Sequence, residues 1–429
     1  MGDIGLLHFT FAYRCGCRTR ARRGSVFARA KDVKALAYPI SELDPYSPAF
    51  MDDPYPQLEA LREAGPAVRL ERYDCWAISR YEQVNEMLLD WATYCSSSGA
   101  GLSDFRKEKP WRVPSIILET DPPLHTRTHK ILARVMTPSA LRSLRPALER
   151  EAEALVDQLL VRETVDGAVD IAQAFPLKVF PDAIGLPADG RENLMPYGNM
   201  VFNAIGPRNA LLEAAMASAA TVVPWIMAAC SRAALTPGGI GSEVYAAVDA
   251  GEATEEEAGM LVRSLLSAGL DTTIAAIGNA LVCFARFPDQ WSIVRNDPSI
   301  MRQAFDESMR LESPVQAFFR TTTRDVEVAG VEIGEGEKVL LFFASANRDP
   351  RRWENPAEFD VRRRSGAHVA FGLGIHRCVG EMLAEIEGEI LLSELARRVR
   401  SITLEADPTL HYNNSLRSFA KIPLRLEPA

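Results

Sequence analysis

Apolar residues recur at helical spacing over long stretches of this chain, and the longest such stretch runs from Thr254 to Phe287. Thr254 followed by three glutamates has the form of a capping box, and Pro288 cannot continue the helix, so both ends of the stretch are marked. At 1.5 Å per residue, a helix of this length would extend about 50 Å. We expect two further helical stretches, over residues 139–163 and 210–235.

Strand signals are confined to two parts of the chain. Alternation of apolar and polar residues predicts a hairpin over residues 67–70 and 75–78. Strand-like runs return after Thr321, where we expect strands over 326–331 and 338–343 and a last hairpin over 415–426. Helical segments dominate, so the pattern predicts a helix-rich α+β fold.

The composition excludes several classes of protein. With 429 residues, of which 47% are hydrophobic, the chain can bury a core large enough to enclose a cofactor, as two or three domains or as one large helical unit. The sequence contains no run of about 18 uninterrupted apolar residues, so we predict no membrane span. The net charge of −9 argues against general nucleic-acid binding. The seven cysteines are scattered, which favours a reducing cytoplasm over a disulfide framework.

The first 38 residues differ from the rest in charge. Eight basic residues lie between Arg14 and Lys34, against only Asp3 and Asp32. A short apolar patch precedes the basic run, which is the reverse of a secretory signal. We predict a disordered extension over residues 1–38 and a single domain over 39–429, with a targeting sequence as the alternative interpretation of the extension.

Cys378 lies in a glycine-rich loop, Phe371-Gly372-Leu373-Gly374-Ile375-His376-Arg377-Cys378-Val379-Gly380. Glycine accepts a positive φ and allows the backbone to approach a flat ligand closely. Apolar residues recur at helical spacing after the loop, so a helix would begin near Val379, and its free N–H groups would stabilise a thiolate. A single cysteine taken alone is more commonly a small core hydrophobe, but this context favours a ligand.

This loop resembles the haem-binding loop of the cytochrome P450 family, in which phenylalanine, glycine, histidine or arginine, cysteine and glycine recur at these offsets. The resemblance implies a mainly α fold, with a large helical domain, a smaller β-rich region and haem b between them. It implies that Cys378 is the proximal ligand of the iron and that Phe371 and Gly372 belong to the haem site. For the haem propionates it points to His125, His129, Arg320 and His376. At His129 the family usually has arginine, and a histidine cannot make the forked contact of a guanidinium.

Glu307 and Arg310 are three residues apart on a predicted helix. By itself this spacing is more typical of a solvated surface ion pair. The pair precedes the cysteine loop by about 70 residues, as in the family. The resemblance therefore implies a buried structural network of Glu307, Arg310 and Arg362.

The segment Ala268-Gly269-Leu270-Asp271-Thr272-Thr273 lies midway along the longest predicted helix. Threonine hydroxyls inside a helix can bond back to a carbonyl and bend it, so a packing kink is one interpretation. The resemblance implies another, in which Gly269 allows haem and dioxygen to approach. Asp271 and Thr272 would then relay protons, which favours dioxygen activation over use of peroxide.

A narrower resemblance concerns the substrate. From about residue 40 onward the chain is similar to bacterial members that oxidise para-substituted benzoic acids, typically demethylating 4-methoxybenzoate, in the runs 101–112, 262–267 and 313–320. A carboxylate entering an apolar pocket needs compensating donors. Arg263 precedes the kink by two turns, about 11 Å, which is roughly the length of such an acid. We expect carboxylate donors from Arg112, Ser115, Arg263 and Ser264, and apolar walls from Leu118, Phe202, Ile205, Val315 and Phe318.

Ile205 stands where this group leads us to expect phenylalanine. Isoleucine is smaller and not planar, so we expect a wider pocket near the para substituent. Such a pocket would accept bulkier or longer acids, such as cinnamates.

The sequence thus predicts a haem-thiolate monooxygenase that inserts one atom of O2 into a C–H bond of an aromatic carboxylic acid. On a methoxy group the product hemiacetal collapses to a phenol and formaldehyde. No flavin or nicotinamide domain fits in this length, so we expect a [2Fe–2S] ferredoxin with an NAD(P)H-dependent reductase, docking at Arg127 and Arg377, and a monomeric enzyme. The alternatives are a terpenoid or macrolide substrate, and a haem-based gas sensor or storage protein.

Overall fold

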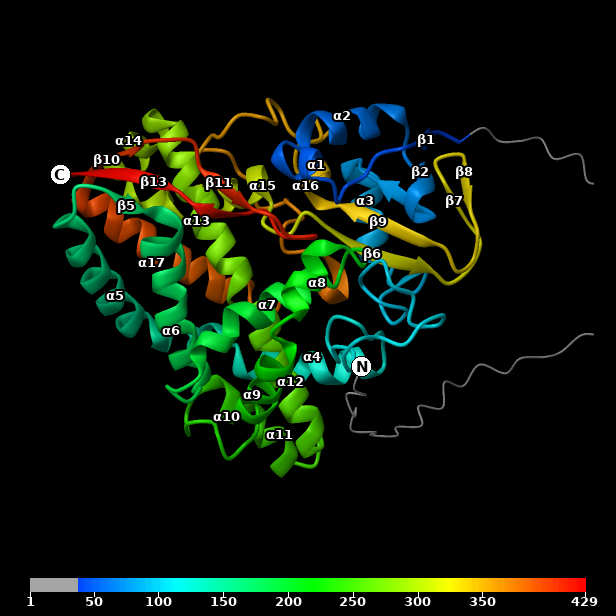
Figure 1. Ribbon diagram of the computed structural model, residues 1–429, viewed down its shortest axis with the longest axis horizontal. Coiled ribbons are helices and arrows are strands. Elements are labelled where there is room, and N and C mark those ends of the chain that lie inside the picture. The colour runs from blue at the N-terminus through cyan, green and yellow to red at the C-terminus, as the bar shows by residue number, and fades with distance from the viewer. Residues whose placement is uncertain (1–37) are drawn as a thin grey trace, which may run out of the picture. The chain divides into compact units, whose positions relative to one another are not determined.

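Helices make up most of the chain and lie beside a mixed β-sheet in the computed structural model, which describes residues 38–429 (Figure 1). The predicted extension over residues 1–38 therefore lies outside the described residues, except for Tyr38. The helices before the core helix are α1 (Pro48–Asp52), α2 (Tyr55–Ala64), α3 (Tyr81–Leu89), α4 (Leu124–Val135), α5 (Pro138–Leu160), α6 (Ala174–Ile184), α7 (Leu194–Asn203), α8 (Ala210–Met216), α9 (Ala219–Ala229), α10 (Ile240–Val244) and α11 (Ala246–Asp249). The core helix and the later helices are α12 (Glu255–Ala268), α13 (Asp271–Arg286), α14 (Pro288–Asn296), α15 (Met301–Glu312), α16 (Phe343–Ala346) and α17 (Glu381–Arg398).

The long helix predicted from the apolar pattern is present but broken. The capping box is confirmed, because the Thr254 hydroxyl accepts a hydrogen bond from the Glu257 N–H at 3.1 Å. The helix is interrupted over Gly269 and Leu270, between α12 and α13. Among the described residues, this stretch alone is long and apolar enough to cross a membrane by itself. However, 78% of its most apolar window is buried inside the protein, as expected for a core helix.

The largest sheet of the described chain contains β6, the strand that carries Phe318 and Arg320. Its strand order is β1 (Ile40–Ser41), β2 (Val68–Leu70), β3 (Cys75–Ile78), β9 (Lys338–Phe342), β6 (Ala317–Thr322) and β4 (Tyr94–Cys95). Strands β2 and β3 are antiparallel, which confirms the predicted hairpin. Strand β6 runs antiparallel to β9, with Arg320 opposite Val339. Because side chains alternate along a strand, Phe318 and Arg320 share one face of β6.

The carboxyl-terminal strands belong to smaller sheets. These sheets contain β10 (Val399–Leu404), β13 (Pro423–Pro428) and β5 (Val165–Asp166); β11 (Thr409–His411) and β12 (Ser418–Lys421); and β7 (Val326–Val328) and β8 (Val331–Ile333). The predicted hairpin over 415–426 is wrong, because β12 pairs with β11 whereas β13 pairs with β10 and β5. Buried Ile422 lies between β12 and β13. Its N–H donates to Asp166 Oδ1 and its carbonyl accepts from the N–H of Gly167, so these hydrogen bonds interrupt the run between the two strands.

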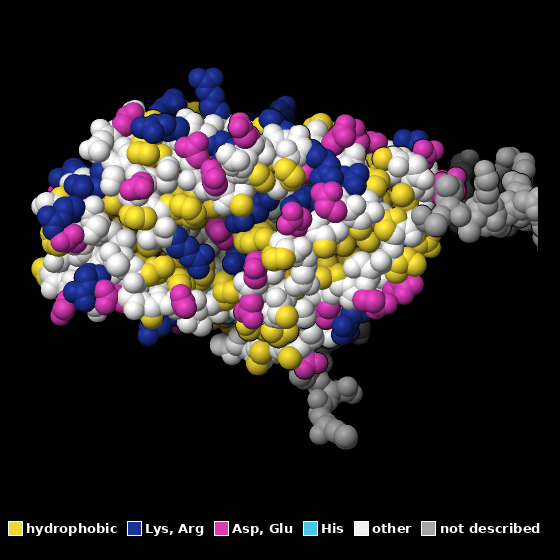
Figure 2. All heavy atoms as spheres, turned by 90° about the horizontal axis from the view of Figure 1, so that it is seen from above, with side chains coloured by type: hydrophobic (Ala, Val, Ile, Leu, Met, Phe, Trp, Pro, Cys, Tyr) yellow, Lys and Arg dark blue, Asp and Glu magenta, His cyan; other side chains and the backbone are white. Residues whose placement is uncertain are grey.

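Figure 1 shows the helices α5, α6, α13 and α17 gathered at one end of the described unit and the strands β1, β2, β6 and β9 at the other. This arrangement confirms the predicted mainly α fold with a smaller β-rich region. On the face seen in Figure 2, basic and acidic side chains are interspersed with apolar ones. That face therefore lacks the continuous basic surface that nucleic-acid binding requires.

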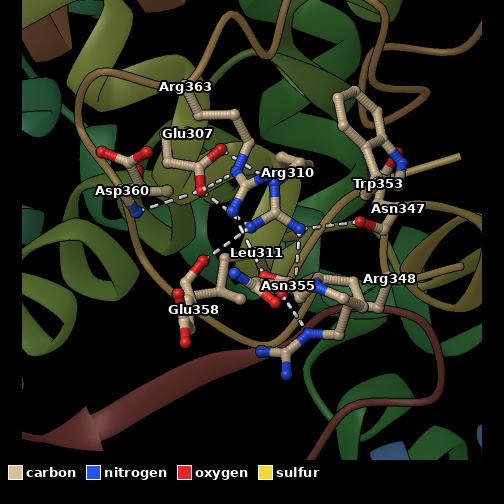
Figure 3. A network of polar contacts seen from close by, with 12 residues as sticks. Glu307, Arg310, Leu311, Asn347, Arg348, Trp353, Asn355, Glu358, Asp360 and Arg363 are labelled. Atoms are coloured by element: carbon tan, nitrogen blue, oxygen red, sulfur yellow. Dashed lines mark hydrogen bonds and ion pairs between the residues drawn. The ribbon is translucent and has the colours of Figure 1, made fainter. Parts of the chain in front are cut away.

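A buried guanidinium holds the segment before the cysteine loop. Arg310 is fully buried and donates to both carboxylate oxygens of Glu307, at 2.8 and 2.7 Å. Its remaining hydrogen bonds go to the carbonyls of Asn347, Pro356 and Glu358, at 2.8, 2.8 and 3.0 Å (Figure 3). The predicted buried pair on α15 is thus found, and it anchors the chain that follows α16.

The third predicted member of this network is wrong by one position. Arg362 is exposed, and its backbone N–H donates to Asp360 in a turn. That turn directs the next side chain inward, so Arg363 donates to Glu307 Oε1 at 3.0 Å (Figure 3). Arg363 also donates to the carbonyls of Glu354 and Asn355. Adjacent arginines look equivalent in the sequence, and only the turn distinguishes them.

We predict that Arg363→Ala destabilises the protein by about 3 kcal/mol, because it leaves the Glu307 carboxylate buried with one charged partner fewer. Arg362→Ala is the matched control and should change stability by less than about 0.5 kcal/mol, as expected for an exposed side chain. Denaturant unfolding of both variants measures the difference. Equal destabilisation by the two substitutions would contradict the assignment.

Candidate active site

The cysteine loop is closed by backbone contacts. The N–H of Cys378 donates to the carbonyl of Phe371 at 2.9 Å, and Gly372 and Gly374 have positive φ values of 67° and 66°. A Cβ on Gly374 would lie 2.5 Å from the carbonyl oxygen of Leu88 in α3, so glycine is required there. Helix α17 begins at Glu381, two residues later than predicted. The loop therefore places Cys378 directly before a helix, as expected.

The Cys378 thiol is exposed by accessible area, although many protein atoms surround it. The Cys378 side chain therefore has accessible surface even though protein atoms surround it. Burial raises the pKa of Cys378 to about 11, while the N–H groups of Gly380 and Glu381 act in the opposite direction. These two N–H groups belong to the start of α17 and favour negative charge on the sulfur.

Three predicted polar residues form a buried cluster near this loop. The rings of His125 and His376 are 4.3 Å apart between centroids, and the rings of His125 and His129 are 5.3 Å apart. Burial lowers the pKa of His125 to about 4. His125 Nε2 and both ring nitrogens of His376 are buried without a hydrogen-bond partner. His129 lies at the edge of this cluster, against His125.

Arg320 and Asp121 complete the cluster. Arg320 is 4% exposed, and its one hydrogen bond goes to the Phe319 carbonyl, at 2.8 Å. Burial lowers the pKa of Arg320 to about 10. Asp121 lies 3.7 Å from His376 Nε2, which is too long for a hydrogen bond. One carboxylate thus faces several buried donors, and the cluster has the chemistry to bind further anionic groups.

The break in the core helix confirms that threonines bond back to carbonyls. The Thr272 hydroxyl donates to Ala268 at 2.7 Å, and the Thr273 hydroxyl donates to Gly269 at 3.0 Å. The role expected for Gly269 beside haem stays a prediction, and the structure gives a separate reason for glycine at this position. A Cβ there would lie 2.5 Å from the ring of Phe180 in α6. Gly269 is therefore required because α6 packs closely against the break, and a ligand is not needed to explain it.

Asp271 is buried at the start of α13 and faces α7. Its Oδ2 has no hydrogen-bond partner, and a Cβ on Gly198 would lie 1.7 Å from this oxygen. Burial raises the pKa of Asp271 to about 7. At neutral pH the carboxyl group therefore exists in both protonation states, which suits a group that takes up and releases protons.

The four predicted carboxylate donors lie together. The hydroxyls of Ser115 and Ser264 are 3.2 Å apart. Arg263 is 4% exposed and donates to the carbonyls of Val113 and Pro114, at 2.9 and 3.2 Å. These contacts join the loop after Trp111 to α12.

Sequence reasoning missed a carboxylate at this position. Glu119 Oε2 accepts from Arg112 Nη1 at 3.0 Å and from the N–H of Ser115 at 2.6 Å. Arg112 Nε is buried without a partner. Glu119 follows the apolar run 116–118 and precedes Asp121, so it could have been read as the first of two acidic residues before α4.

Most of the predicted apolar walls also meet. Phe202 and Ile205 form a small buried cluster, against which Val315 and Phe318 pack. Leu416 of the carboxyl-terminal segment joins them and forms a bridge with Val315, which the sequence did not reveal. Leu118 lies outside this cluster, and its N–H donates to the Ser115 hydroxyl at 3.1 Å.

Buried amides hold α7 against the carboxyl-terminal segment. The Asn414 side chain donates to the Asn203 carbonyl at 2.8 Å, and the Ser415 hydroxyl donates to the Phe202 carbonyl at 2.7 Å. On the other side, the buried ammonium of Lys338 donates to the carbonyls of Ser98, Gly99 and Gly101, at 3.2, 2.8 and 2.9 Å. Neither contact was predicted, and both fix backbone near the apolar cluster.

A cavity of about 380 Å³ opens beside these residues and does not include Cys378. Arg112 and Glu119 line it together with Val201 and Ile205. Exposed Lys109, Arg208 and Glu213 also line it. The cavity therefore connects the exposed surface with the charged group around Arg112.

Comparison with known proteins places this geometry in a family. A family model described as Cytochrome P450 matches residues 243–427. The chain is 51% identical over 388 residues to cytochrome p450 CYP199A2 of Rhodopseudomonas palustris, covering 90% of this chain and 94% of that protein. It is 28% identical over 411 residues to the epothilone C/D epoxidase of Sorangium cellulosum, covering 91% and 96%.

The chain belongs to the cytochrome P450 family. A solved structure of cytochrome P450 CREJ in complex with (4-ethylphenyl) dihydrogen phosphate superposes with a TM-score of 0.80, at 27% identity, covering 90% of this chain and 99% of that chain. The expected fold is therefore confirmed. The protein is a monooxygenase with haem b as its cofactor, and the sensor interpretation is not supported.

The described residues fit this P450 cofactor. Haem b has a metal that a thiolate can bind, and two carboxylate side chains. Cys378 presents an accessible sulfur at the start of α17. His125, His376 and Arg320 present buried donors with few partners or none. The unpaired polar atoms are thus explained by the group that the family binds.

We predict that Asp271→Asn changes how the stability of this P450 depends on pH. The native pKa of Asp271, about 7, is above its usual value, so its stabilising contribution is complete below about pH 4 and is lost as pH rises through 7. The asparagine variant, with haem bound, should therefore unfold at a higher temperature than wild type at pH 8 and at a similar temperature at pH 4.5. A difference that does not change with pH would contradict the raised pKa.

Proposed function

We propose that this P450 oxidises para-substituted aromatic carboxylic acids of the benzoate and cinnamate type. The observation that carries the proposal is the juxtaposition of a buried cationic group, Arg112 and Arg263 with the hydroxyls of Ser115 and Ser264, with a small apolar cluster around Phe202. An aromatic acid needs both an anion site and an apolar wall. The resemblance to bacterial benzoate-oxidising P450s points to the same class.

The proposed roles of the cofactor site follow from its geometry. Haem b, when bound, activates O2 for insertion into a C–H bond. Cys378 is the proposed iron ligand, with Phe371 and Gly372 in the surrounding loop. His125, His376 and Arg320 are the proposed donors to the propionates, with His129 contributing beside His125.

Asp271 and Thr272 are proposed to move protons on the opposite side of the haem. With a pKa of about 7, Asp271 can take up and release a proton at neutral pH. The Thr272 hydroxyl donates to the Ala268 carbonyl and keeps lone pairs that can accept a hydrogen bond. Gly269 is proposed to act indirectly, because it permits the close packing of α6 that shapes the break.

The proposal also includes an external source of electrons for the haem. A [2Fe–2S] ferredoxin with its NAD(P)H-dependent reductase is the proposed donor. The two expected docking residues are already in ion pairs, Arg377 with Glu381 at 2.6 Å and Arg127 with Glu257 at 2.5 Å. An acidic partner would therefore have to rearrange these pairs. The monomeric state and the cytoplasmic location stay predictions.

A macrolide or terpenoid substrate is the second candidate. The similarity to an epothilone C/D epoxidase favours it. Glu119 balances one of the charges of Arg112 and Arg263, and a neutral macrolide would leave the other without a counter-charge, which is costly in a buried group. The aromatic acid therefore accounts for more of the site.

We predict that Arg112→Ala weakens binding of 4-methoxybenzoate by at least about tenfold, because a hydrogen bond to a charged group is worth about 1.5–3 kcal/mol. Lys109→Ala, an exposed cation lining the same cavity, is the control and should change the affinity by less than about threefold. Titration of the change in haem spin state measures both. Unchanged affinity in Arg112→Ala would rule out the carboxylate model.

The pocket near Ile205 generates another prediction. Wild type should bind both 4-methoxybenzoate and 4-methoxycinnamate, because isoleucine leaves space beside Phe202 that a phenylalanine would fill. Ile205→Phe should weaken cinnamate binding by about tenfold and benzoate binding by less, since overpacking costs about 1–3 kcal/mol. If wild type binds the benzoate and gives no response to the cinnamate, the idea of a widened pocket fails.

A further inference from the structure

The carboxylate of Glu119 lies within the proposed anion site, which consists of Arg112, Ser115, Arg263 and Ser264. Its side chain is 9% exposed, and that of Arg112 is 15% exposed, so their ion pair is largely removed from water. The same oxygen, Oε2, also accepts from the N–H of Ser115. Glu119 therefore contacts two of the groups that are proposed to receive the substrate.

The charge of this buried group can be counted from its contacts. Arg112 and Arg263 are cationic, and Glu119 is the carboxylate that contacts Arg112. Glu119 and Arg112 both act on the guanidinium of Arg263, with opposite effects on its pKa. Within the described chain, two guanidinium groups and one carboxylate leave one net positive charge. Lys109, Arg208 and Glu213 lie at the exposed end of the cavity, where solvent screens them.

Donors remain available while Glu119 is bound. Arg112 has five N–H donors in a planar fork, and Nε is buried without a partner. Glu119 occupies Nη1 and thereby orients the fork. The ligand does not have to displace Glu119, but it enters the field of this carboxylate.

We propose that Glu119 is a specificity-determining residue that restricts the anion site to singly charged ligands. The inference rests on the proposed function, because it concerns the same site. A monoanion matches the single net positive charge. A dianion, such as an aryl phosphate, would bring one charge too many into a group removed from water. Glu119 thus selects aromatic carboxylates over aryl phosphate dianions of the same shape.

The size of the effect depends on ligand charge. Coulomb energy is proportional to the charge of the ligand, so neutralising Glu119 favours a dianion by twice the free energy that it favours a monoanion. In affinities, the gain of the dianion is then the square of the gain of the monoanion. We expect Glu119→Gln to bind monoanions roughly tenfold more tightly and dianions roughly a hundredfold.

The experiment compares two tetrahedral ligands that differ in charge. 4-Methoxybenzenesulfonate carries one negative charge, whereas 4-methoxyphenyl phosphate at pH 8 carries close to two. Calorimetric titration of the full-length, haem-loaded protein gives both dissociation constants, with 4-methoxybenzoate as the reference. Wild type should bind the sulfonate more tightly than the phosphate, and Glu119→Gln should reduce or reverse this preference. Glutamine retains the oxygen that accepts from Arg112 and Ser115.

Glu213→Gln is the matched control. It removes one negative charge from the same cavity, but at the exposed end, and should leave both constants unchanged within about twofold. A wild-type preference for the phosphate would overturn the proposal without any variant, so the test does not depend on the folding of Glu119→Gln. Equal gains for both ligands, or weaker binding in that variant, would also overturn it. If wild type binds none of the three ligands, the proposed function itself fails.

Discussion

The buried guanidinium of Arg310 is the interaction on which the arrangement of this P450 depends. Two of its five hydrogen bonds go to Glu307 on the same helix, α15, and the other three join α15 to the segment between α16 and the cysteine loop. Removing a charge from water is costly, and hydrogen bonds to every donor offset much of that cost. Because Glu307 and three carbonyls satisfy these donors, the irregular chain around Asn347 and Glu358 has a defined path toward Cys378. Arg363 adds a second cation to the same carboxylate.

The other buried arginines are satisfied to different degrees, and the difference distinguishes structural from binding roles. Arg310 has all its donors paired. Arg320 has one hydrogen bond, to its neighbour's carbonyl, and Arg112 has a buried Nε without a partner. Natural proteins rarely leave such groups unpaired, so an unpaired buried donor here is available to a water molecule or to an anion that the chain itself does not supply. Near Cys378 the anion that we propose is a haem propionate, and near Arg112 it is the proposed substrate.

Burial also changes the acidity of Asp271. The carboxyl lies against Gly198 without a hydrogen-bond partner, and its pKa is raised to about 7. At the nearby break over Gly269 and Leu270, the ring of Phe180 of α6 occupies the space that a side chain at position 269 would need. Helix packing and the proposed proton handling therefore involve neighbouring residues. A substitution that relieves the packing would change the proton chemistry as well.

The sequence by itself determined the helix-rich class of fold, the position of the cysteine loop and the long core helix, because these features follow from local periodicity and from residue types at fixed spacing. The burial of Glu307 and Arg310 was expected only from the family resemblance, because their spacing alone is more typical of a surface pair. Tertiary structure decided which of two adjacent arginines turns inward, that β12 and β13 separate, and that Gly269 serves helix packing. It also brought Glu119, Leu416 and Lys338 to the site from distant or unremarkable positions. These features depend on contacts between segments far apart in the chain, and local patterns carry no record of such contacts.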